Sequence, residues 1–413
     1  MTTEVRRNEH LVFKSDDNGC RSAITDDASV IHLYAVITPE IKGDAMTQIE
    51  SAIRRLDTLL RSENMLEAVV NQTVFLREIG DKQLVRQLMM EYYGENLPAI
   101  TYVAQTPCDG SAVIVEIHAI ASKTVPVEIK RLEETCVSVS YAGTSFDFVG
   151  DLVSDPWPIG SYARSYNVFE HMKERLGRGG FAMADLLRTW IYQGHIVLRE
   201  GDTQRYKELN RARTDFFAGI DFIKKLLPPA KRGYVCPAST GIGADDVDVA
   251  MTAFAIQTDR NDVIAVPLEN PGQTPAFDYG EYYSPQSPKF ARAMAYSFDG
   301  HCTILVSGTA SITDSETRFV GDPAGQANQT LDNIAMLIAG DNTTSHGVPG
   351  FDADLKDMVV ARVYVKRPEY YDAIRAVCEK RFGDSPIVYT FADVCRDDLL
   401  VEMEGIASCQ RGK

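Results

Sequence analysis

Two stretches of the chain share one pattern of apolar positions. Each begins with Gly-Asp-x-x-x-Gln, at residues 43–48 and 321–326. Apolar residues follow this glutamine at the spacing of one stripe along an α-helix, the face that would lie on a sheet. The two stripes are Ile53, Leu56, Leu59 and Leu60 in the first stretch and Leu331, Ile334, Leu337 and Ile338 in the second.

The same elements follow both helices. In the first stretch the pattern predicts a strand at 71–76 and a second helix at 82–93. In the second stretch it predicts a strand at 361–365 and a second helix at 369–382. Each stretch closes with a predicted strand, and 115–122 is identical to 401–408 at five of eight positions. We therefore interpret the two stretches as copies of one unit.

A weaker copy lies between them. Phe169, Met172 and Leu176 form its helix stripe, and they are followed by a strand at 188–192, a helix at 205–217 and a closing segment at 251–256. The repeated order of strands and helices predicts an α+β unit with its helices on one face of a sheet. We place the three units at residues 1–124, 125–258 and 259–413.

Charge and cysteine usage narrow the function. The formal net charge of −16 would repel phosphates, so we expect no nucleic-acid partner. The eight cysteines form no CxxC motif and do not pair with histidines at zinc-ligand spacing, so we expect free thiols and no metal. The polar N-terminus and the lack of a membrane-spanning stretch indicate a cytoplasmic protein without a membrane partner.

Motifs for phosphate or redox cofactors are also missing, and we expect no cofactor. The segment Ser-Thr-Gly-Ile-Gly at 239–243 lacks the lysine of a P-loop, and we interpret it as a hairpin turn. The helix at 205–217 carries several arginines, and we expect these to face solvent.

The units resemble the RidA (YjgF-like) superfamily. The resemblance rests on Ser-Gly-Thr at 307–309, the Gly-Asp-x-x-x-Gln helix start, Asn333-Ile334 and Val-Glu-Met-Glu at 401–404. It implies a chorismate-mutase-like α+β fold that normally forms a homotrimer, with ligand clefts between subunits. Three units in one chain would close the same ring internally, as a monomeric pseudo-trimer or a weak dimer.

Three further segments resemble the chorismatase branch of this superfamily. They lie at 284–293, 307–312 and 393–402. Within that branch, Gly308 and Cys395 are similar to the members that make 3-hydroxybenzoate. Tyr389 occupies the position of the arginine that deaminating RidA proteins use, so the third unit resembles those deaminases less closely.

Chorismate chemistry assigns roles to particular residues. Releasing pyruvate from this dianion requires a proton on the enolpyruvyl methylene carbon, and a carboxyl group with a raised pKa is a suitable general acid. The resemblance implies that Glu402 is this acid, that Cys395 assists, and that Glu116 matches Glu402 in the first unit. The substrate-binding residues that we expect are Arg375, Arg362, Tyr279, Tyr283, Gly308 and Thr309, while Arg292 is expected to anchor its loop.

Two other functions remain open at this point. The protein is either a chorismatase-like enzyme acting on an anionic small molecule without a cofactor, a RidA-type enamine or imine deaminase or hydrolase, or a non-catalytic ligand-binding protein. A Glu402→Gln variant would distinguish these three functions. Loss of pyruvate release would indicate the chorismatase-like enzyme, and loss of ammonia release from an imine would indicate the deaminase. Ligand binding without turnover would indicate the binding protein.

Overall fold

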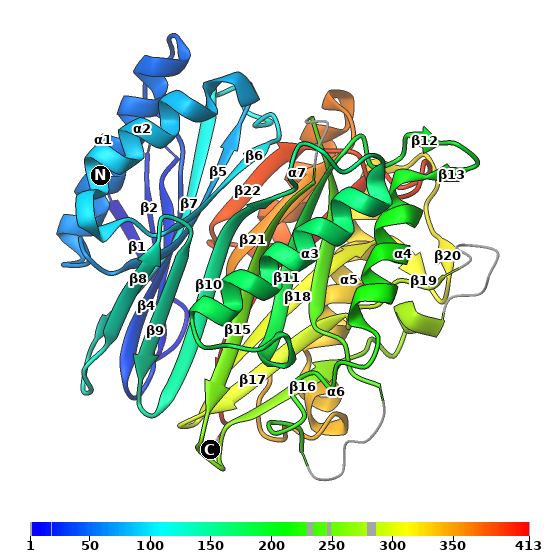
Figure 1. The fold of residues 1–413 in the computed structure, drawn as a ribbon. Helices are drawn as coiled ribbons and strands as arrows, with labels where there is room; N and C mark the ends of the chain where they lie inside the picture. The colour runs from blue at the N-terminus through cyan, green and yellow to red at the C-terminus, as the bar shows by residue number, and fades with distance from the viewer. Residues whose placement is uncertain (1, 18, 229–233, 246–248, 279–285, 413) are drawn as a thin grey trace.

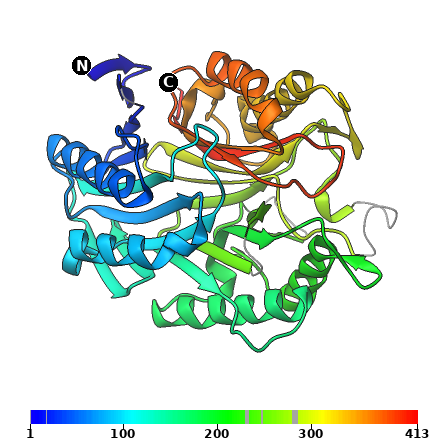
Figure 2. The same cartoon turned by 90° about the horizontal axis from the view of Figure 1, so that it is seen from above.

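The computed structural model is a mixed α+β protein built around three large sheets, and it describes residues 2–17, 19–228, 234–245, 249–278 and 286–412. Helices lie at the outside of the molecule and the sheets lie toward its middle (Figures 1 and 2). Within these ranges, no helix is long and apolar enough to cross a membrane.

The first sheet has the strand order β1-β2-β3-β4-β7-β5-β6. Its helices are α1 (Ala45–Ser62) and α2 (Lys82–Tyr93), which confirms both predicted helices of the first stretch. The strands are β1 (Thr2–Arg6), β2 (Leu11–Asp16), β3 (Arg21–Asp26), β4 (Val30–Ile37), β5 (Val69–Leu76), β6 (Ala99–Ala104) and β7 (Val113–Ser122).

The second sheet has the order β14-β11-β15-β10-β9-β8. It is accompanied by α3 (Ser161–Arg178), α4 (Arg205–Phe217) and a short ribbon of β12 (Arg199–Glu200) and β13 (Thr203–Gln204). The strands are β8 (Glu128–Glu133), β9 (Cys136–Tyr141), β10 (Thr144–Val153), β11 (Leu186–Gly194), β14 (Ala238–Ala244) and β15 (Val249–Thr258).

The third sheet has the order β16-β17-β18-β23-β21-β22. It is accompanied by α5 (Pro323–Ile338), α6 (Gly340–Ser345), α7 (Tyr371–Phe382) and a ribbon of β19 (Ile312–Thr313) and β20 (Glu316–Thr317). The strands are β16 (Ile264–Leu268), β17 (Ala293–Phe298), β18 (His301–Ala310), β21 (Met358–Val365), β22 (Ile387–Phe391) and β23 (Val401–Gln410).

All three sheets contain the same four-strand arrangement. Each has a parallel pair joined through a helix, namely β5-α2-β6, β11-α4-β14 and β21-α7-β22. A helix is the usual connection between parallel neighbours because the chain must cross back over the sheet. The closing strand, β7, β15 or β23, pairs antiparallel with the first strand of each pair. On its other side it pairs antiparallel with the fourth strand, β4, β10 or β18.

The segment at 239–243 is strand β14 and not the predicted hairpin turn. Its glycines permit close packing rather than a turn. A Cβ atom on Gly243 would lie 2.7 Å from the carbonyl oxygen of Asp393, and one on Gly241 would lie 3.3 Å from the Tyr206 ring. Glycine inside a strand often marks such a close approach.

The Gly-Asp-x-x-x-Gln motif begins α1 and α5 and also sets the register of the closing strands. Its aspartates, Asp44 and Asp322, cap the two helices by accepting a backbone hydrogen bond. The Oε1 atoms of Gln48 and Gln326 accept the N–H groups of Ala112 and Leu400 at 2.8 Å, one residue before β7 and β23 begin.

This register makes Glu116 the counterpart of Glu404, not of Glu402 as the sequence match suggested. Glu116 and Glu404 each lie four residues after the N–H group that the helix glutamine holds. The position of Glu402 is taken by Ile114 in the first sheet. A shift of two residues keeps every side chain on the same face of the strand, so the pattern of apolar positions does not reveal the shift.

Four buried charges join the three sheets at their inner faces. Arg362 on β21 donates hydrogen bonds from Nε and Nη2 to the carboxylate of Glu116 on β7, at 2.8 and 2.7 Å. Its Nη1 atom contacts Glu404 on β23 at 3.2 Å, and Arg188 on β11 pairs with the same carboxylate. Two arginines and two glutamates balance, so no net charge is buried in this cluster.

We predict that Arg362→Met lowers the free energy of unfolding by about 3–5 kcal/mol, because Glu116 would keep a buried charge without its partner. Urea unfolding followed by circular dichroism measures this change. Arg54→Met is the matched control, since Arg54 is 60% exposed on α1. Equal stability of the two variants would contradict a central role for the cluster.

Candidate active site

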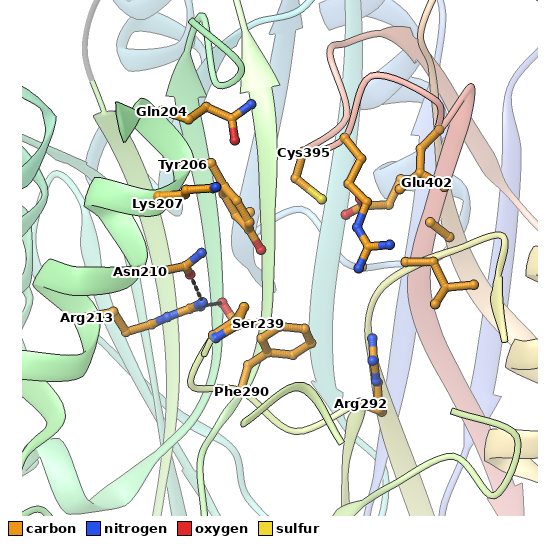
Figure 3. Close-up of a pocket in the computed structure, with 17 residues that line it drawn as sticks. Gln204, Tyr206, Lys207, Asn210, Arg213, Ser239, Phe290, Arg292, Cys395 and Glu402 are labelled. Atoms are coloured by element: carbon orange, nitrogen blue, oxygen red, sulfur yellow. Dashed lines mark hydrogen bonds between the residues drawn. The ribbon is translucent and has the colours of Figure 1, made fainter. Parts of the chain in front are cut away.

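A deep cleft lies between the second and third sheets. It encloses about 820 Å³, part of it open to solvent. One wall comes from α4 and β14, and the other from β18, β23 and the loop before β23 (Figure 3). The lining residues are Gln204, Tyr206, Lys207, Asn210, Arg213, Ser239, Gly241, Pro288, Phe290, Arg292, Gly308, Ala310, Ile312, Cys395, Arg396, Leu399 and Glu402.

Glu402 is the buried carboxyl group of this cleft. It lies on β23 opposite Ala310 of β18, and it is only 5% exposed. Among the residues that the structure describes, none donates a hydrogen bond to it. Burial, and after it the negative charge of Glu404, raise the pKa of Glu402 to about 8, although Arg292 and Arg188 act in the opposite direction. The group is therefore mainly protonated at neutral pH and can donate a proton.

Gly308 makes room for this carboxyl group. A Cβ atom at this position would collide with Oε1 of Glu402 and would lie 3.1 Å from Cγ2 of Thr240. The backbone N–H of Gly308 donates to the Thr240 hydroxyl at 2.9 Å. Thr309 is the next residue, but its hydroxyl donates to the carbonyl of Ser307 at 2.9 Å, and it does not line the cleft.

Cys395 lies on the same wall as Glu402 (Figure 3). Burial, followed by the charge of Glu402, raises the pKa of this thiol to about 12. Cys395 is therefore a neutral thiol at physiological pH rather than a nucleophilic thiolate.

Arg213 supplies a buried positive charge on the opposite wall. Its side chain is about 2% exposed and donates to Asn210 Oδ1 at 2.6 Å and to Ser239 Oγ at 3.1 Å. No carboxylate of the described part of the chain pairs with it, and burial lowers its pKa. A buried guanidinium without a counter-ion is costly, so this wall favours an anionic ligand.

The prediction that the helix at 205–217 turns its arginines to solvent is wrong for Arg213. Tyr206, Asn210 and Arg213 all line the cleft from one face of α4. Their spacing of four and three residues is that of a single helical stripe, and this signal was present in the sequence. A helix face in solvent carries the same kind of polar stripe, so only the tertiary packing shows whether such a face lines a cleft or lies in water.

Arg292 both anchors its loop and lines the cleft. Its Nη2 atom donates to the carbonyl of Thr274 at 3.0 Å. The Phe290 ring lies between Arg292 and Arg213, with its centroid 5.5 Å from the guanidinium carbon of each. Lys207 and Arg396 add positive charge at the lining, so the cleft is suited to an anion.

The structure brings together only part of the predicted site. Glu402, Cys395 and Gly308 line one cleft. Arg362 is held in the buried charge cluster, and Arg375 lines a different cleft between the first and third sheets. Tyr279 and Tyr283 lie outside the described residues. In the described part of the chain, His, Cys, Asp and Glu side chains do not gather in a group that could hold a metal ion.

A curated relative decides the family. The 3-hydroxybenzoate synthase of Streptomyces hygroscopicus is 32% identical over 262 residues, which cover 60% of this chain and 71% of the relative. The chain belongs to the chorismatase family.

A second relative and a solved structure are also similar to the chain. A chorismatase of Streptomyces hygroscopicus is 33% identical over 227 residues, covering 54% of this chain and 61% of that protein. A crystal structure of a chorismatase shares the fold, with a TM-score of 0.64 and 23% identity over 92% of this chain and all of that one. No family model matches the chain. The match to the 3-hydroxybenzoate synthase confirms the chorismatase resemblance inferred from the sequence motifs.

We predict that one glutamate carboxyl of this chorismatase-family protein titrates near pH 8. The protonated form predominates below that value and is lost as the pH rises through it, because the folded pKa lies above the ordinary value of about 4.3. NMR of protein labelled with ¹³C at the glutamate carboxyl carbon measures this, and Glu402→Gln assigns the signal. A Glu402 signal that titrates below pH 5 would refute the prediction.

Proposed function

We propose that the protein releases pyruvate from chorismate and leaves a hydroxybenzoate, with 3-hydroxybenzoate favoured. The observation that carries this proposal is a single cleft with a protonated Glu402 on one wall and, on the other, Arg213, which has no carboxylate partner among the described residues. A general acid and an anion-binding cation are what an anionic enolpyruvyl ether needs. The names of the two curated relatives agree with this substrate class.

In the proposed reaction, Arg213 and Arg292 hold the carboxylates of the substrate. Glu402 transfers its proton to the terminal methylene carbon of the enolpyruvyl group, which creates an oxocarbenium-like centre. Water or the C4 oxygen of the ring captures this centre, and the bond between the former enol carbon and the C3 oxygen then breaks, so that pyruvate leaves and the ring keeps its C3 oxygen. The ring becomes 3-hydroxybenzoate when its C4–oxygen bond breaks and the C3 hydrogen leaves as a proton. The C4 oxygen departs as water in the first route, which returns the water that was added, and as the carbonyl oxygen of pyruvate in the second. Pyruvate and 3-hydroxybenzoate together contain the atoms of chorismate, so no co-reactant is consumed.

Gly308 and Cys395 are proposed to favour the 3-hydroxybenzoate product. Gly308 allows the ring to approach Glu402 closely, since even a methyl group there would collide with the carboxyl. Cys395 lies beside the acid as a neutral thiol, and we assign it to shaping the ring site rather than to nucleophilic attack. The sequence-based roles of Arg362, Arg375 and Thr309 in substrate binding stay predictions, and the present proposal does not use them.

We further propose that the chain is an intramolecular pseudo-trimer of RidA-like units at 1–124, 125–258 and 259–413. The repeated strand order of the three sheets supports this arrangement. Contacts between neighbouring sheets support it as well: Thr101 of β6 hydrogen-bonds Thr252 of β15, Thr240 of β14 bonds Glu404 of β23, and Arg362 of β21 bonds Glu116 of β7. These contacts run from the first sheet to the second, the second to the third and the third to the first.

Purified protein is expected to release pyruvate from chorismate, and Glu402→Gln is expected to lower kcat at least about 100-fold, because general acid catalysis is lost. In the wild type, kcat should fall as the pH rises above about 8, where Glu402 loses its proton. A lactate dehydrogenase-coupled assay measures pyruvate, and mass spectrometry identifies the aromatic product.

Asp147→Asn is the matched control for this assay. Asp147 is a fully buried carboxyl group whose burial raises its pKa to about 6, yet it does not line the cleft. Its variant should retain wild-type kcat. Absence of pyruvate above background in the wild type, or full activity of Glu402→Gln, would refute the proposed function.

Light scattering coupled to size exclusion should give a mass near 45.7 kDa, the mass of one chain. In the proposed pseudo-trimer, both walls of each described cleft come from the same chain. A stable trimer of whole chains would contradict the pseudo-trimer.

A further inference from the structure

A second cleft of about 610 Å³ lies between the third and first sheets. It is built from the elements that correspond to those of the first cleft. Helix α7 and strand β22 take the places of α4 and β14, and strands β4 and β7 take the places of β18 and β23. Its lining includes Arg21, Tyr371, Arg375, Glu379 and Tyr389.

This second cleft lacks the proposed acid. The register of β7 places Ile114 where Glu402 lies in the first cleft, and Ile114 lines the second cleft. An isoleucine can donate no proton. A ligand held here would bind without the proton transfer proposed for Glu402.

Two arginines of the second cleft share one carboxylate as their ion-pair partner. The carboxylate of Glu379 lies 2.8 Å from Arg21 Nη1 and 3.7 Å from Arg375 Nε, so two guanidinium groups share one acid. Asp109 also lines the cleft and, like Arg375, is exposed; its carboxylate accepts hydrogen bonds from the backbone and hydroxyl of Ser111. The trio of Arg21, Arg375 and Glu379 therefore carries one net positive charge, which a ligand carboxylate would contact.

The wall beside these charges is aromatic and carries an unused donor. Tyr371 and Tyr389 pack edge to face at 5.6 Å, and the Arg375 guanidinium lies 5.9 Å from the Tyr371 ring. Tyr389 is only 8% exposed, and its buried hydroxyl has no hydrogen-bond partner among the described residues. An unsatisfied buried hydroxyl is costly, and a ligand oxygen would relieve that cost.

We propose that this second cleft binds a small aromatic monocarboxylate without turning it over. The carboxylate contacts Arg21 and Arg375, and the ring packs on Tyr371 with an oxygen near the Tyr389 hydroxyl. The binding rests on this cleft alone. The choice of 3-hydroxybenzoate as the probe rests on the proposed function, because that acid is both a member of this ligand class and the favoured product.

Calorimetric titration with 3-hydroxybenzoate tests the proposal. The wild type should bind two equivalents, one in each cleft. Tyr389→Phe, which removes a single oxygen, and Arg21→Gln should each weaken binding to one of these sites about 10-fold. Both variants should release pyruvate from chorismate at the wild-type rate, and the exposed control Arg54→Gln should leave both sites unchanged.

Absence of binding by the wild type, or unchanged affinity at every site in Tyr389→Phe and Arg21→Gln, would overturn the proposal. A failure of the proposed function gives a different result. In that case chorismate is not consumed, yet a site sensitive to Tyr389→Phe remains.

Discussion

The buried pairing of Arg362 and Arg188 with Glu116 and Glu404 is the interaction on which the rest of the structure depends. The four side chains come from β21, β11, β7 and β23, so the cluster contains strands of all three sheets. Charges buried this deeply are tolerated only when each has a partner. Any displacement of one sheet would separate opposite charges in a medium that screens them poorly. The cluster therefore fixes the relative positions of the sheets, and with them the shapes of the clefts between them.

The same cluster sets the chemistry of its neighbour. Glu404 and Glu402 alternate along one face of β23, but only Glu404 is surrounded by donors, including Arg188, Arg362, Tyr364 and Thr240. Glu402 has no such donors among the described residues, and burial followed by the negative charge of Glu404 raises its pKa. Two carboxyl groups on one strand thus have different surroundings: Glu404 is held by donors, whereas Glu402 is kept protonated and can serve as an acid.

The clefts between neighbouring sheets differ because one chain encodes each of them separately. The first cleft has Glu402 facing Arg213, whereas the second has Ile114 at the corresponding position and a Glu379 carboxylate between two arginines. At the remaining boundary, Thr101 and Thr252 bond each other at 2.7 Å, and Lys82 pairs with Asp151 at 2.9 Å. A homotrimer could not make these differences, since one substitution there would alter all three boundaries.

The sequence by itself determined the main helices and the closing strands, their order, and Glu402 as the candidate acid. The stripe from Leu331 to Ile338 and the alternation in β23 predicted their helix and strand because a 3.6-residue or two-residue period identifies a buried face. Only the tertiary structure decided the register of β7 against β23, the partner of Arg362, and the assembly of Arg213 with Glu402. The physical reason is that periodicity states which side of an element is buried, but not which distant element covers it. A shift of two residues, or a polar helix face turned to a cleft instead of to water, leaves the local pattern unchanged.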